Sequence, residues 1–508
     1  MKEFSISTYV RELEENNLLI NTNCSKETGD VVVKKVSYNS NDVTENTLFV
    51  CKGAGFKEEY LDMAIEKGAV AYISQKDYHK DIPCIMVSNA QKALSLTAIK
   101  YYNNPQENLK LIGITGTKGK TTTANFVKSI LDDYLRDKHL PEAGIITTDS
   151  VFDGKNKISS NLTTPESLEL QKYFFTAVNN NTQYMVVEVS SQALKYGRVH
   201  GVCFDVGVFL NISEDHISDI EHTDYNDYFT SKLKLFNNCI TACVNLNSDE
   251  VSEVLAAAQK ADRVMTFGIG QAANVCGYNI LDDAFEPVFY AKTDLFSRKF
   301  NLKMSGIFNV ENALAAIAVA NSLGIPEKYI YSGLSKAKVN GRMDKYTSKN
   351  GEKVVVVDYA HNKLSFNRLY DSVQKQYPGH KIITVFGCPG EKAITRRRDL
   401  GLISGLRSNK IIITMEDPGT ENIREICEEI AQYVKQNNNN YEIVEDRTEA
   451  IRRAILLPEP NTVVLITGKG DERYQRIGKK TIKYPSDVEN AIRFLEEYET
   501  VKRLKQVN

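Results

Sequence analysis

A glycine-rich turn with two lysines and several threonines separates an apolar stretch from a helical one. The segment Leu111-Ile-Gly-Ile-Thr-Gly-Thr-Lys-Gly-Lys-Thr-Thr-Thr123 places Gly116 and Gly119 before Lys120 and Thr121. Backbone N–H groups of such a turn can surround phosphate oxygens, the lysine can neutralise the β- and γ-phosphates, and the threonine hydroxyl can bind Mg²⁺. Isoleucine replaces the first glycine of the usual loop. The pattern predicts a nucleotide phosphate site; the alternative is a glycine-rich turn without a ligand.

Acidic residues and a histidine follow two further apolar stretches. Glu188 ends Tyr184-Met-Val-Val-Glu, and Asp215-His216 lies shortly after Asn211-Ile-Ser. At strand ends beside the phosphate site, both groups can act as magnesium ligands or position water. The alternative is a solvated carboxylate and an ordinary loop histidine. No Asn-Lys-x-Asp sequence stands at a strand end, which argues against a small GTPase.

Polar or glycine-rich residues also follow four apolar stretches in the carboxy-terminal part. These continuations are Asp358–His361, Gly387–Gly390, Glu416–Gly419 and Gly468–Glu472. Open α/β sheets bind ligands at the carboxyl ends of their strands. We therefore expect the four strand ends to line one crevice.

The elements that must position these residues alternate between short β-branched runs and helical stretches. Strands are expected near 109–115, 184–189, 206–212 and 242–247, and again near 354–357, 381–386, 410–415 and 462–467. A helix is expected over 309–323. The alternation predicts an α/β fold with parallel sheets. We expect a small N-terminal α/β domain at 1–106, a central P-loop ATPase-like parallel sheet at 107–339 and a C-terminal Rossmann-like α/β domain at 340–508.

The composition is that of a globular protein. Its 508 residues correspond to about three domains of roughly 150 residues. With 42% hydrophobic and 25% charged residues, disorder and fibrous repeats are unsuitable interpretations. A net charge of −2 argues against chain-wide binding of nucleic acid or anionic membrane. Apolar runs are too short to span a membrane and the N-terminus resembles no signal peptide, so we expect a cytoplasmic protein. The nine cysteines form no CxxC pair, which favours buried free thiols.

Short motifs spread along the chain together resemble the Mur ligase family in order and spacing. They are Gly116–Thr122, Thr163–Pro165, Glu188–Ser191, Tyr228–Lys232, Gly306–Asn312, Gly341–Arg342, Asp358–His361 and Gly468–Glu472. The chain is most similar to the MurE branch, whose members add the third amino acid to UDP-N-acetylmuramoyl-L-alanyl-D-glutamate in peptidoglycan synthesis. The resemblance implies an ATP-dependent ligase that activates a carboxylate as an acyl phosphate before an amine attacks.

The resemblance also implies roles for particular residues. ATP would contact Gly116, Thr117, Lys118, Gly119, Lys120, Thr121, Thr122, Asn309, Asn312, Arg342, Asp358 and His361. Mg²⁺ would be bound by Thr121, Glu188, His216 and Lys232, the last as the CO₂-derived carbamate N6-carboxylysine. Lys234 is the alternative lysine. The catalytic groups would be Lys120, Glu188, His216 and Lys232.

The UDP-N-acetylmuramoyl dipeptide would be held by residues of the first two domains. Thr163, Thr164, Ser190 and Arg198 match positions that bind the muramoyl dipeptide in the family. Ser40 lies where the family usually has Asp-Ser-Arg, but the triplet here is Asn39-Ser-Asn41. We expect a monomer that binds this nucleotide and a free amino acid, with no nucleic acid and no membrane span.

The residues after the C-terminal strands bear on which amino acid is added. Family members that use meso-diaminopimelate typically carry Asp-Asn-Pro-Arg where this chain has Glu416-Asp-Pro-Gly419, so the arginine for a distal carboxylate is missing. Carboxylates at Glu416, Asp417 and Glu472, beside Gly468, instead suit a distal ammonium, which favours L-lysine and then L-ornithine. The alternative is that these acids are solvated.

A second departure concerns the α-carboxylate of the amino acid. Lys392 stands where the family often has arginine, and lysine lacks the two-pronged guanidinium. One of Arg396, Arg397 and Arg398 could substitute, but three basic residues at a helix start more often form a solvated face.

Two other functions compete with this interpretation. A folylpolyglutamate synthase would share the phosphate site, although such enzymes generally lack the N-terminal domain. A P-loop ATPase or regulatory module would turn over ATP without any amino acid.

Overall fold

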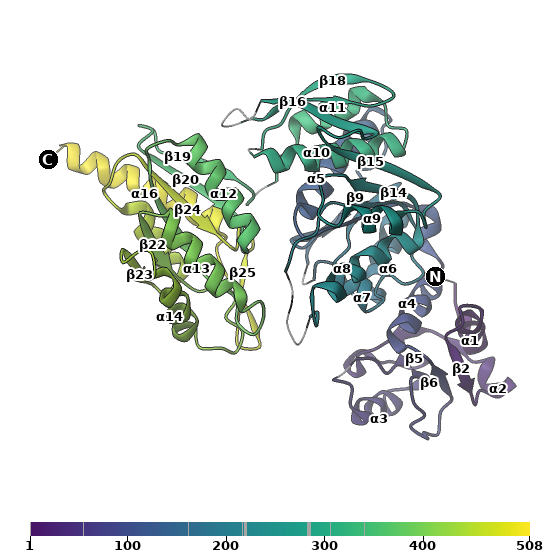
Figure 1. The fold of residues 1–508 in the computed structure, drawn as a ribbon. Coiled ribbons are helices and arrows are strands. Elements are labelled where there is room, and N and C mark those ends of the chain that lie inside the picture. The colour runs from purple at the N-terminus through teal and green to yellow at the C-terminus, as the bar shows by residue number, and fades with distance from the viewer. Residues whose placement is uncertain are drawn as a thin grey trace.

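The computed structural model describes residues 2–53, 55–160, 162–215, 217, 221–281, 286–304, 306–339 and 341–507. It has an α/β fold with N-terminal, central and C-terminal domains, as predicted (Figure 1). In the view of Figure 1 the N-terminal domain lies below the central domain, and the C-terminal domain lies to one side of it. Within the described residues, no helix is both long and apolar enough to cross a membrane.

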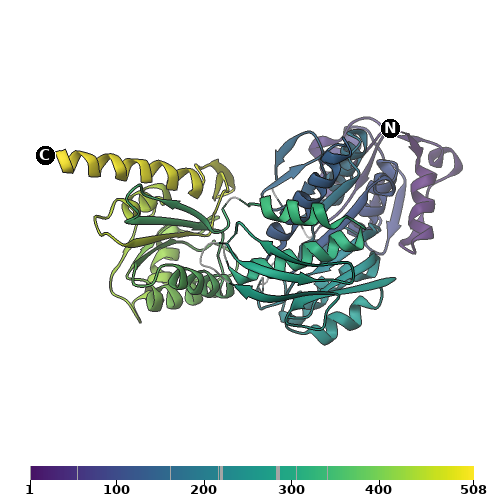
Figure 2. The same cartoon turned by 90° about the horizontal axis from the view of Figure 1, so that it is seen from above.

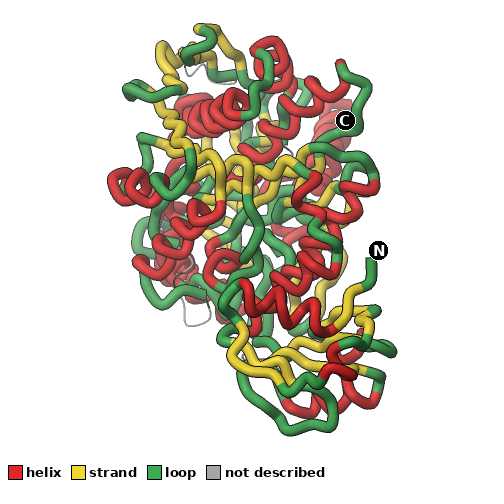
Figure 3. The backbone as a smooth tube through the Cα atoms, turned by 90° about the vertical axis from the view of Figure 1, so that its right-hand side faces the viewer, coloured by secondary structure: helices red, strands yellow, loops and turns green. Residues whose placement is uncertain are grey.

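The N-terminal domain is built on a five-stranded sheet of order β2-β7-β6-β5-β4, which Figure 3 shows apart from the larger sheets. β4, β5, β6 and β7 pair in parallel, and β2 is antiparallel to β7. The elements are β1 (Phe4–Ser5), α1 (Ile6–Glu15), β2 (Leu19–Thr22), α2 (Lys26–Gly29), β3 (Val32–Val33), β4 (Lys35–Ser37), β5 (Thr47–Val50), α3 (Glu58–Glu66), β6 (Ala69–Ser74), β7 (Cys84–Val87) and α4 (Ala90–Tyr101).

The central domain contains an eleven-stranded sheet of order β11-β10-β9-β12-β8-β13-β14-β15-β16-β17-β18. The strands from β9 to β16 in that order are parallel, while β10, β11, β17 and β18 are antiparallel additions at the two edges. The elements are β8 (Lys110–Thr115), α5 (Lys120–Asp137), β9 (Gly144–Ile146), β10 (Ser150–Phe152), β11 (Lys157–Ser159), α6 (Ser167–Asn179), β12 (Tyr184–Glu188), α7 (Ser191–Lys195), β13 (Phe204–Phe209), α8 (Tyr225–Leu233), β14 (Cys239–Asn245), α9 (Val251–Ala258), β15 (Arg263–Ile269), β16 (Val275–Leu281), β17 (Val288–Lys292), β18 (Ser297–Asn301), α10 (Ile307–Ser322) and α11 (Glu327–Lys336).

Both faces of the parallel strands are covered by apolar side chains, as parallel sheets require. In β8, Ile112 and Ile114 pack with α5, α10 and α11, whereas Leu111 belongs to the cluster on the opposite face. That second cluster continues into α4 of the N-terminal domain, where Leu94 packs in the same apolar core as Phe174 of α6. The N-terminal and central domains therefore share one core at their junction.

The C-terminal domain has a six-stranded sheet of order β19-β20-β24-β21-β22-β23, parallel except for β19. Figure 2 shows α16 extending along one side of this domain. The elements are β19 (Asp344–Thr347), β20 (Lys353–Asp358), α12 (Lys363–Gln376), β21 (Lys381–Phe386), α13 (Thr395–Arg407), β22 (Lys410–Ile413), α14 (Ile423–Val434), β23 (Tyr441–Ile443), α15 (Arg447–Leu456), β24 (Thr462–Thr467), β25 (Tyr474–Ile477), β26 (Lys480–Lys483) and α16 (Asp487–Val507). All eight strands predicted across the two larger domains are present.

A buried ion pair fixes the carboxyl ends of two of these strands. Arg447 donates to both carboxylate oxygens of Asp487, at 2.9 and 2.7 Å. The same guanidinium donates to the carbonyl of Thr467, where β24 ends, at 2.6 Å and to the carbonyl of Met415 after β22 at 3.3 Å. Both side chains are almost completely buried. The pair thus holds the start of α16 against the two strand ends that lead into Glu416 and Gly468.

Removing one charge of this pair should destabilise the protein. Asp487→Asn leaves a buried arginine without its counter-ion, so we expect the free energy of unfolding to fall by about 3–5 kcal/mol. Urea unfolding followed by circular dichroism measures the change. Glu497→Gln, which breaks the half-exposed ion pair with Arg452 at 2.6 Å, is the control and should have little effect. Equal losses in the two variants would contradict the assigned role of the buried pair.

Candidate active site

A cavity of about 480 Å³ lies between the central and C-terminal domains. It contains residues from the phosphate turn, from β12 and α8, and from the carboxyl ends of the C-terminal strands. The residues predicted from sequence that line it are Thr117, Lys118, Gly119, Lys120, Thr121, Thr122, Thr163, Glu188, Ser190, Arg198, Lys232, Asn309, Asn312, Arg342, Asp358, His361, Lys392, Glu416, Asp417, Gly468 and Glu472. Residues predicted to bind three different substrates therefore meet in one cavity.

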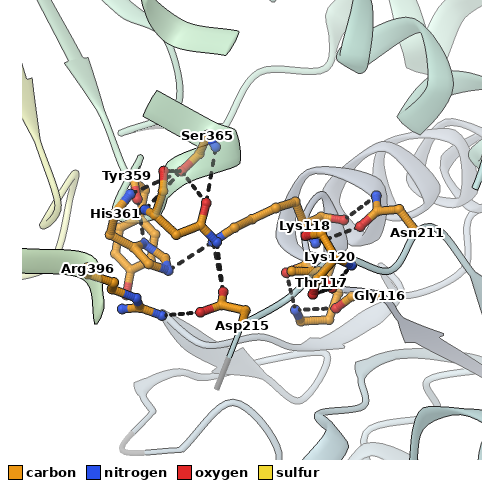
Figure 4. A network of polar contacts seen from close by, with 12 residues as sticks. Gly116, Thr117, Lys118, Lys120, Asn211, Asp215, Tyr359, His361, Ser365 and Arg396 are labelled. Atoms are coloured by element: carbon orange, nitrogen blue, oxygen red, sulfur yellow. Dashed lines mark hydrogen bonds and ion pairs between the residues drawn. The ribbon is translucent and has the colours of Figure 1, made fainter. Parts of the chain in front are cut away.

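The glycine-rich turn joins β8 to α5 and is held by Asn211 at the end of β13. The backbone N–H of Lys118 donates to Asn211 Oδ1 at 2.9 Å, and Asn211 Nδ2 donates to the carbonyl of Lys118 at 3.0 Å (Figure 4). Gly119 has φ of +89°, and a Cβ there would lie 2.3 Å from Asn312 Oδ1. Lys120 folds over the turn and donates to the carbonyls of Gly116 and Thr117 at 2.8 and 3.2 Å. This is the predicted strand, loop and helix arrangement.

Lys232 is buried beneath the same turn. It lies on α8, donates to the carbonyl of Gly116 at 3.0 Å and places its Nζ 4.4 Å from the centre of the Tyr228 ring. Burial lowers the pKa of Lys232 well below its usual value, and the positive charge of Lys120 lowers it further. The environment therefore favours the neutral amine more strongly than the surroundings of an ordinary surface lysine do.

A buried carboxylate faces the turn from β12. Glu188 accepts hydrogen bonds from the backbone N–H and the hydroxyl of Thr148, both at 3.3 Å. Burial raises the pKa of Glu188, while Lys120 acts in the opposite direction. His216, predicted from sequence as a metal ligand, lies outside the described residues. Within the described residues, no group of three or more histidine, cysteine, aspartate or glutamate side chains could hold a metal ion.

Asp215 joins the central domain to the C-terminal domain. Its two carboxylate oxygens accept hydrogen bonds from Asn362 Nδ2 at 2.7 Å and Arg396 Nη2 at 2.8 Å (Figure 4). Lys118 Nζ lies 3.6 Å from the same carboxylate. Asn362 is the N-cap of α12, and Arg396 is in the first turn of α13. One aspartate therefore connects the phosphate turn to the start of two helices of the other domain.

A lysine–histidine contact crosses the same boundary. Lys118 Nζ lies 3.0 Å from His361 Nε2, and His361 Nδ1 lies 2.7 Å from the carbonyl of Tyr359. Because a carbonyl only accepts, Nδ1 carries the proton. Burial and the charge of Lys118 keep the pKa of His361 well below its usual value, so Nε2 accepts from Lys118. Burial lowers the pKa of Lys118 to about 7.

Arg342 and Asp358 bring further charge to the cavity. The Arg342 guanidinium stacks 4.1 Å above the Tyr359 ring, and its Nη2 lies 3.5 Å from the hydroxyl of Thr121. Asp358 accepts backbone N–H groups of Met343 and Ala360 at 2.8 and 2.7 Å, which fixes the chain after β20. Both residues therefore line the cavity from the C-terminal domain.

Three predicted substrate residues do not line the cavity. Thr164 is fully buried, and its hydroxyl donates to the carbonyl of Glu188 at 2.8 Å, so it positions that strand end. Gly116 is covered by Lys120 and Lys232, which both donate to its carbonyl. Ser40 is buried in the N-terminal domain, where Lys67 donates to its carbonyl at 2.9 Å.

Arg198 connects the cavity to the N-terminal domain. Its Nε lies 2.9 Å from Glu166 Oε1, and Glu166 also pairs with Lys52 of the N-terminal domain. Lys52 lies 4.2 Å from the centre of the Tyr38 ring. Ser190 caps α7 by accepting from the N–H of Ala193 at 3.2 Å. The predicted dipeptide residues thus lie between the phosphate turn and the first domain.

The acidic residues predicted to receive a distal ammonium are in different environments. Asp417 Oδ1 accepts from Lys469 Nζ at 2.9 Å, and Lys469 also pairs with Glu472. Glu416 is the exception, because its Oε2 is buried without a hydrogen-bond partner among the described residues. Burial raises the pKa of Glu416 to about 7. A Cβ at Gly468 would lie 2.0 Å from this oxygen, so glycine leaves the space for it.

The expectation that Arg396, Arg397 and Arg398 form a solvated helix face was wrong for two of them. Arg396 is buried against Asp215 and lines the cavity, and Arg397 is buried between Glu421 and Glu429 at 2.8 and 2.7 Å. Only Arg398 is exposed. Asn362 and Lys469 were also not predicted as site residues. No local sequence pattern marks these two residues, because the aspartates that they bond, Asp215 and Asp417, lie more than fifty residues away in the chain.

Two family models and many curated relatives match the chain. Residues 114–320 match the Mur ligase middle domain, and residues 341–470 match the glutamate ligase domain of Mur ligases. A protein of Streptococcus mutans serotype c named UDP-N-acetylmuramoyl-L-alanyl-D-glutamate--L-lysine ligase is 39% identical over 92% of this chain and 93% of its own length. A UDP-N-acetylmuramyl-tripeptide synthetase of Lactobacillus delbrueckii subsp. bulgaricus is 36% identical over 97% of this chain and 99% of its own length.

Solved structures share the fold. A UDP-N-acetylmuramoyl-L-alanyl-D-glutamate--2,6-diaminopimelate ligase superposes with a TM-score of 0.67 at 20% identity, covering 99% of this chain and 100% of that one. A folylpolyglutamate synthase of Mycobacterium tuberculosis, solved with ADP, gives a TM-score of 0.58 at 17% identity over 74% of this chain and 91% of its own. The two domain matches and the curated relatives show that the chain belongs to the Mur ligase family of ATP-dependent ligases.

Proposed function

We propose that the protein joins L-lysine to UDP-N-acetylmuramoyl-L-alanyl-D-glutamate in peptidoglycan biosynthesis, as a monomer in the cytoplasm. ATP phosphorylates one of the two free carboxylates of the glutamyl residue, which releases ADP and leaves an acyl phosphate. The α-amine of lysine then attacks the acyl carbon, and phosphate leaves. The single observation that carries the choice of lysine is the buried, unpartnered oxygen of Glu416 in a cavity that also holds the phosphate turn.

The charges at the phosphate turn support the first half of this reaction. Lys118, Lys120 and Lys232 lie together, and burial lowers the pKa of each amine. A triphosphate entering the cavity supplies negative charge, so its arrival favours the protonated forms of Lys118 and Lys120. Lys120 can then exchange its bonds to the carbonyls of Gly116 and Thr117 for phosphate oxygens.

The residues present suit a magnesium ion. The Thr121 hydroxyl and the Glu188 carboxylate are oxygen donors of the kind that Mg²⁺ prefers, and both line the cavity. We propose that Lys232 completes this set as a carbamate, because only a neutral amine reacts with CO₂ and burial, together with the charge of Lys120, lowers the pKa of this amine. The bound metal would neutralise charge on the transferring phosphoryl group.

The opposite side of the cavity supports a diamino acid with one carboxylate. L-Lysine carries a distal ammonium, which can satisfy Glu416 Oε2 with a charge-assisted hydrogen bond. Diaminopimelate would present a carboxylate to the same buried acid, and the residue aligned with the usual arginine is Gly419. Gly419 has φ of +60° and lies against Glu391, so an arginine there would be strained. The name of the Streptococcus mutans relative agrees with lysine.

Phosphate release tests the proposal directly. Purified protein receives ATP, Mg²⁺ and UDP-N-acetylmuramoyl-L-alanyl-D-glutamate, and L-lysine, L-ornithine, meso-diaminopimelate or L-alanine is added one at a time. We expect turnover with L-lysine and a product of the corresponding mass. Turnover with diaminopimelate instead would contradict the lysine assignment, and turnover indifferent to every amino acid would favour a P-loop ATPase.

Replacing Lys232 should abolish most of the activity. Lys232→Ala removes the proposed carbamate oxygen, and we expect kcat to fall by about 10²-fold or more. Short carboxylates such as acetate should restore part of the rate. Lys234→Ala, an exposed lysine on the next turn, is the matched control and should stay close to wild type. Equal rates in the two variants would exclude a metal-binding role for Lys232.

Replacing Glu416 should reduce discrimination by the distal ammonium. The wild-type protein should prefer L-lysine to L-norleucine, which has the same length without the ammonium. In Glu416→Gln, we expect the ratio of kcat/KM for L-lysine to that for L-norleucine to fall by about 10- to 100-fold. This is the factor produced by the loss of one hydrogen bond to a charged group. An unchanged ratio would show that another acid receives the ammonium.

The same ratio should depend on pH. Below the raised pKa of about 7, Glu416 is protonated and cannot balance an ammonium; above it, the carboxylate is present. The ratio of kcat/KM for L-lysine to that for L-norleucine should therefore rise about tenfold between pH 6 and pH 8. Protonation of the α-amine affects both substrates alike and cancels in this ratio. Glu416→Gln should remove this rise, and a rise that persists in the variant would assign it to a different group.

A further inference from the structure

Arg396 is a cation of the cavity that the proposed reaction does not yet use. It lies in the first turn of α13, is nine-tenths buried and lines the cavity. Its Nη2 donates to Asp215 Oδ1 at 2.8 Å. Among the described residues this is the only hydrogen bond of the guanidinium, and Nε is buried without a partner. A guanidinium has five N–H donors, so most of its capacity is unused.

The neighbouring basic residues Arg397 and Lys392 are less suited than Arg396 to bind a substrate carboxylate. Arg397 is bound by two carboxylates, Glu421 and Glu429, and it does not line the cavity. Lys392 lines the cavity but is only half-buried, and lysine presents a single point charge rather than a fork. Arg396 alone of the three combines burial, a fixed orientation and unused donors at the cavity.

The chemistry of the amino acid restricts where its α-carboxylate can lie. This carboxylate is bonded to the same carbon as the attacking amine, so its receptor must be beside the phosphate turn, where the acyl phosphate forms. Arg396 meets this requirement through Asp215, whose carboxylate lies 3.6 Å from Lys118 of the turn. The arrangement is visible in Figure 4, where Asp215 stands between Arg396 and Lys118.

A second unpartnered atom of opposite charge lies in the same cavity. Glu416 Oε2 follows β22, and Arg396 follows β21, the parallel neighbour of β22. A molecule with a carboxylate at one end and an ammonium at the other can satisfy both buried atoms at once. Both groups are costly to leave unpaired in a buried site.

We propose that Arg396, rather than Lys392, binds the α-carboxylate of the incoming amino acid, and that Asp215 completes this receptor only when the C-terminal domain is closed on the central domain. The inference rests on the proposed function. It makes one guanidinium serve two purposes, since the interdomain bond to Asp215 also orients the donors that face the substrate. An open enzyme would lack the oriented receptor, so the amino acid binds to the closed form.

L-Lysinamide, which keeps both amines but lacks the carboxylate, tests the proposal. The readout is the ratio of kcat/KM for L-lysine to that for L-lysinamide, which is compared between variants so that the different basicity of the amide cancels. Losses of folded protein or of ATP affinity also cancel in this ratio. In Arg396→Met we expect the ratio to fall by about 10- to 100-fold relative to wild type. Lys392→Met should leave it unchanged, and Arg396→Lys should give an intermediate value.

Asp215→Asn examines the link to domain closure. It retains the guanidinium but replaces the carboxylate by a neutral amide, whose NH₂ group cannot accept, so the charge and one of the two bonds to Asn362 and Arg396 are lost. The ratio should therefore fall toward that of Arg396→Met. If the lysine-to-lysinamide ratio stays unchanged in Arg396→Met, or falls in Lys392→Met instead, Arg396 is not the receptor of the α-carboxylate. A ratio unchanged in Asp215→Asn would overturn the coupling to closure. If the wild-type protein uses a different amino acid, the assignment of lysine is wrong, but the receptor can still be tested. That amino acid and its amide then take the place of L-lysine and L-lysinamide in the comparison between variants.

Discussion

The structure depends on an accumulation of positive charge in a cavity shared by two domains. Lys118, Lys120 and Lys232 gather around one glycine-rich turn, and Arg342 and Arg396 approach from the C-terminal domain. Burial lowers the pKa values of the three lysines, and repulsion from neighbouring cations, arginines included, lowers them further. Such a site is complete only with polyanionic ligands, which is what an ATP-dependent ligase brings to it.

Closure of the two domains follows from the same charges. Cations approach the cavity from both domains and would repel one another without an intervening carboxylate. Asp215 provides this carboxylate and accepts hydrogen bonds from Asn362 and Arg396. The Lys118–His361 contact adds a further hydrogen bond across the boundary. The boundary is therefore polar and separable, in contrast to the continuous apolar core between the N-terminal and central domains. A site assembled across such a boundary can open to admit substrates and exclude water when it closes.

Several features were predictable because they depend on local sequence. The phosphate turn, the eight predicted strands and α10 follow from periodicity and glycine placement, and the structure has all of them. The antiparallel strands β10, β11, β17 and β18 were not predicted, because edge strands are short and partly exposed and give a weak alternating pattern. The boundaries of the three domains remain predictions, as do the uridine contacts near Ser40.

The sequence by itself determined the fold class, the phosphate turn and the family, because each is encoded in residues close together or in motifs of fixed order. The tertiary structure decided which charges are used. Arg396 and Arg398 are two residues apart, yet one is buried against Asp215 and the other is exposed. Glu416 and Asp417 are adjacent, yet of the two only Asp417 accepts a hydrogen bond from Lys469. Burial and partners from distant segments set the pKa and the free donors of each group, and no local pattern contains that information.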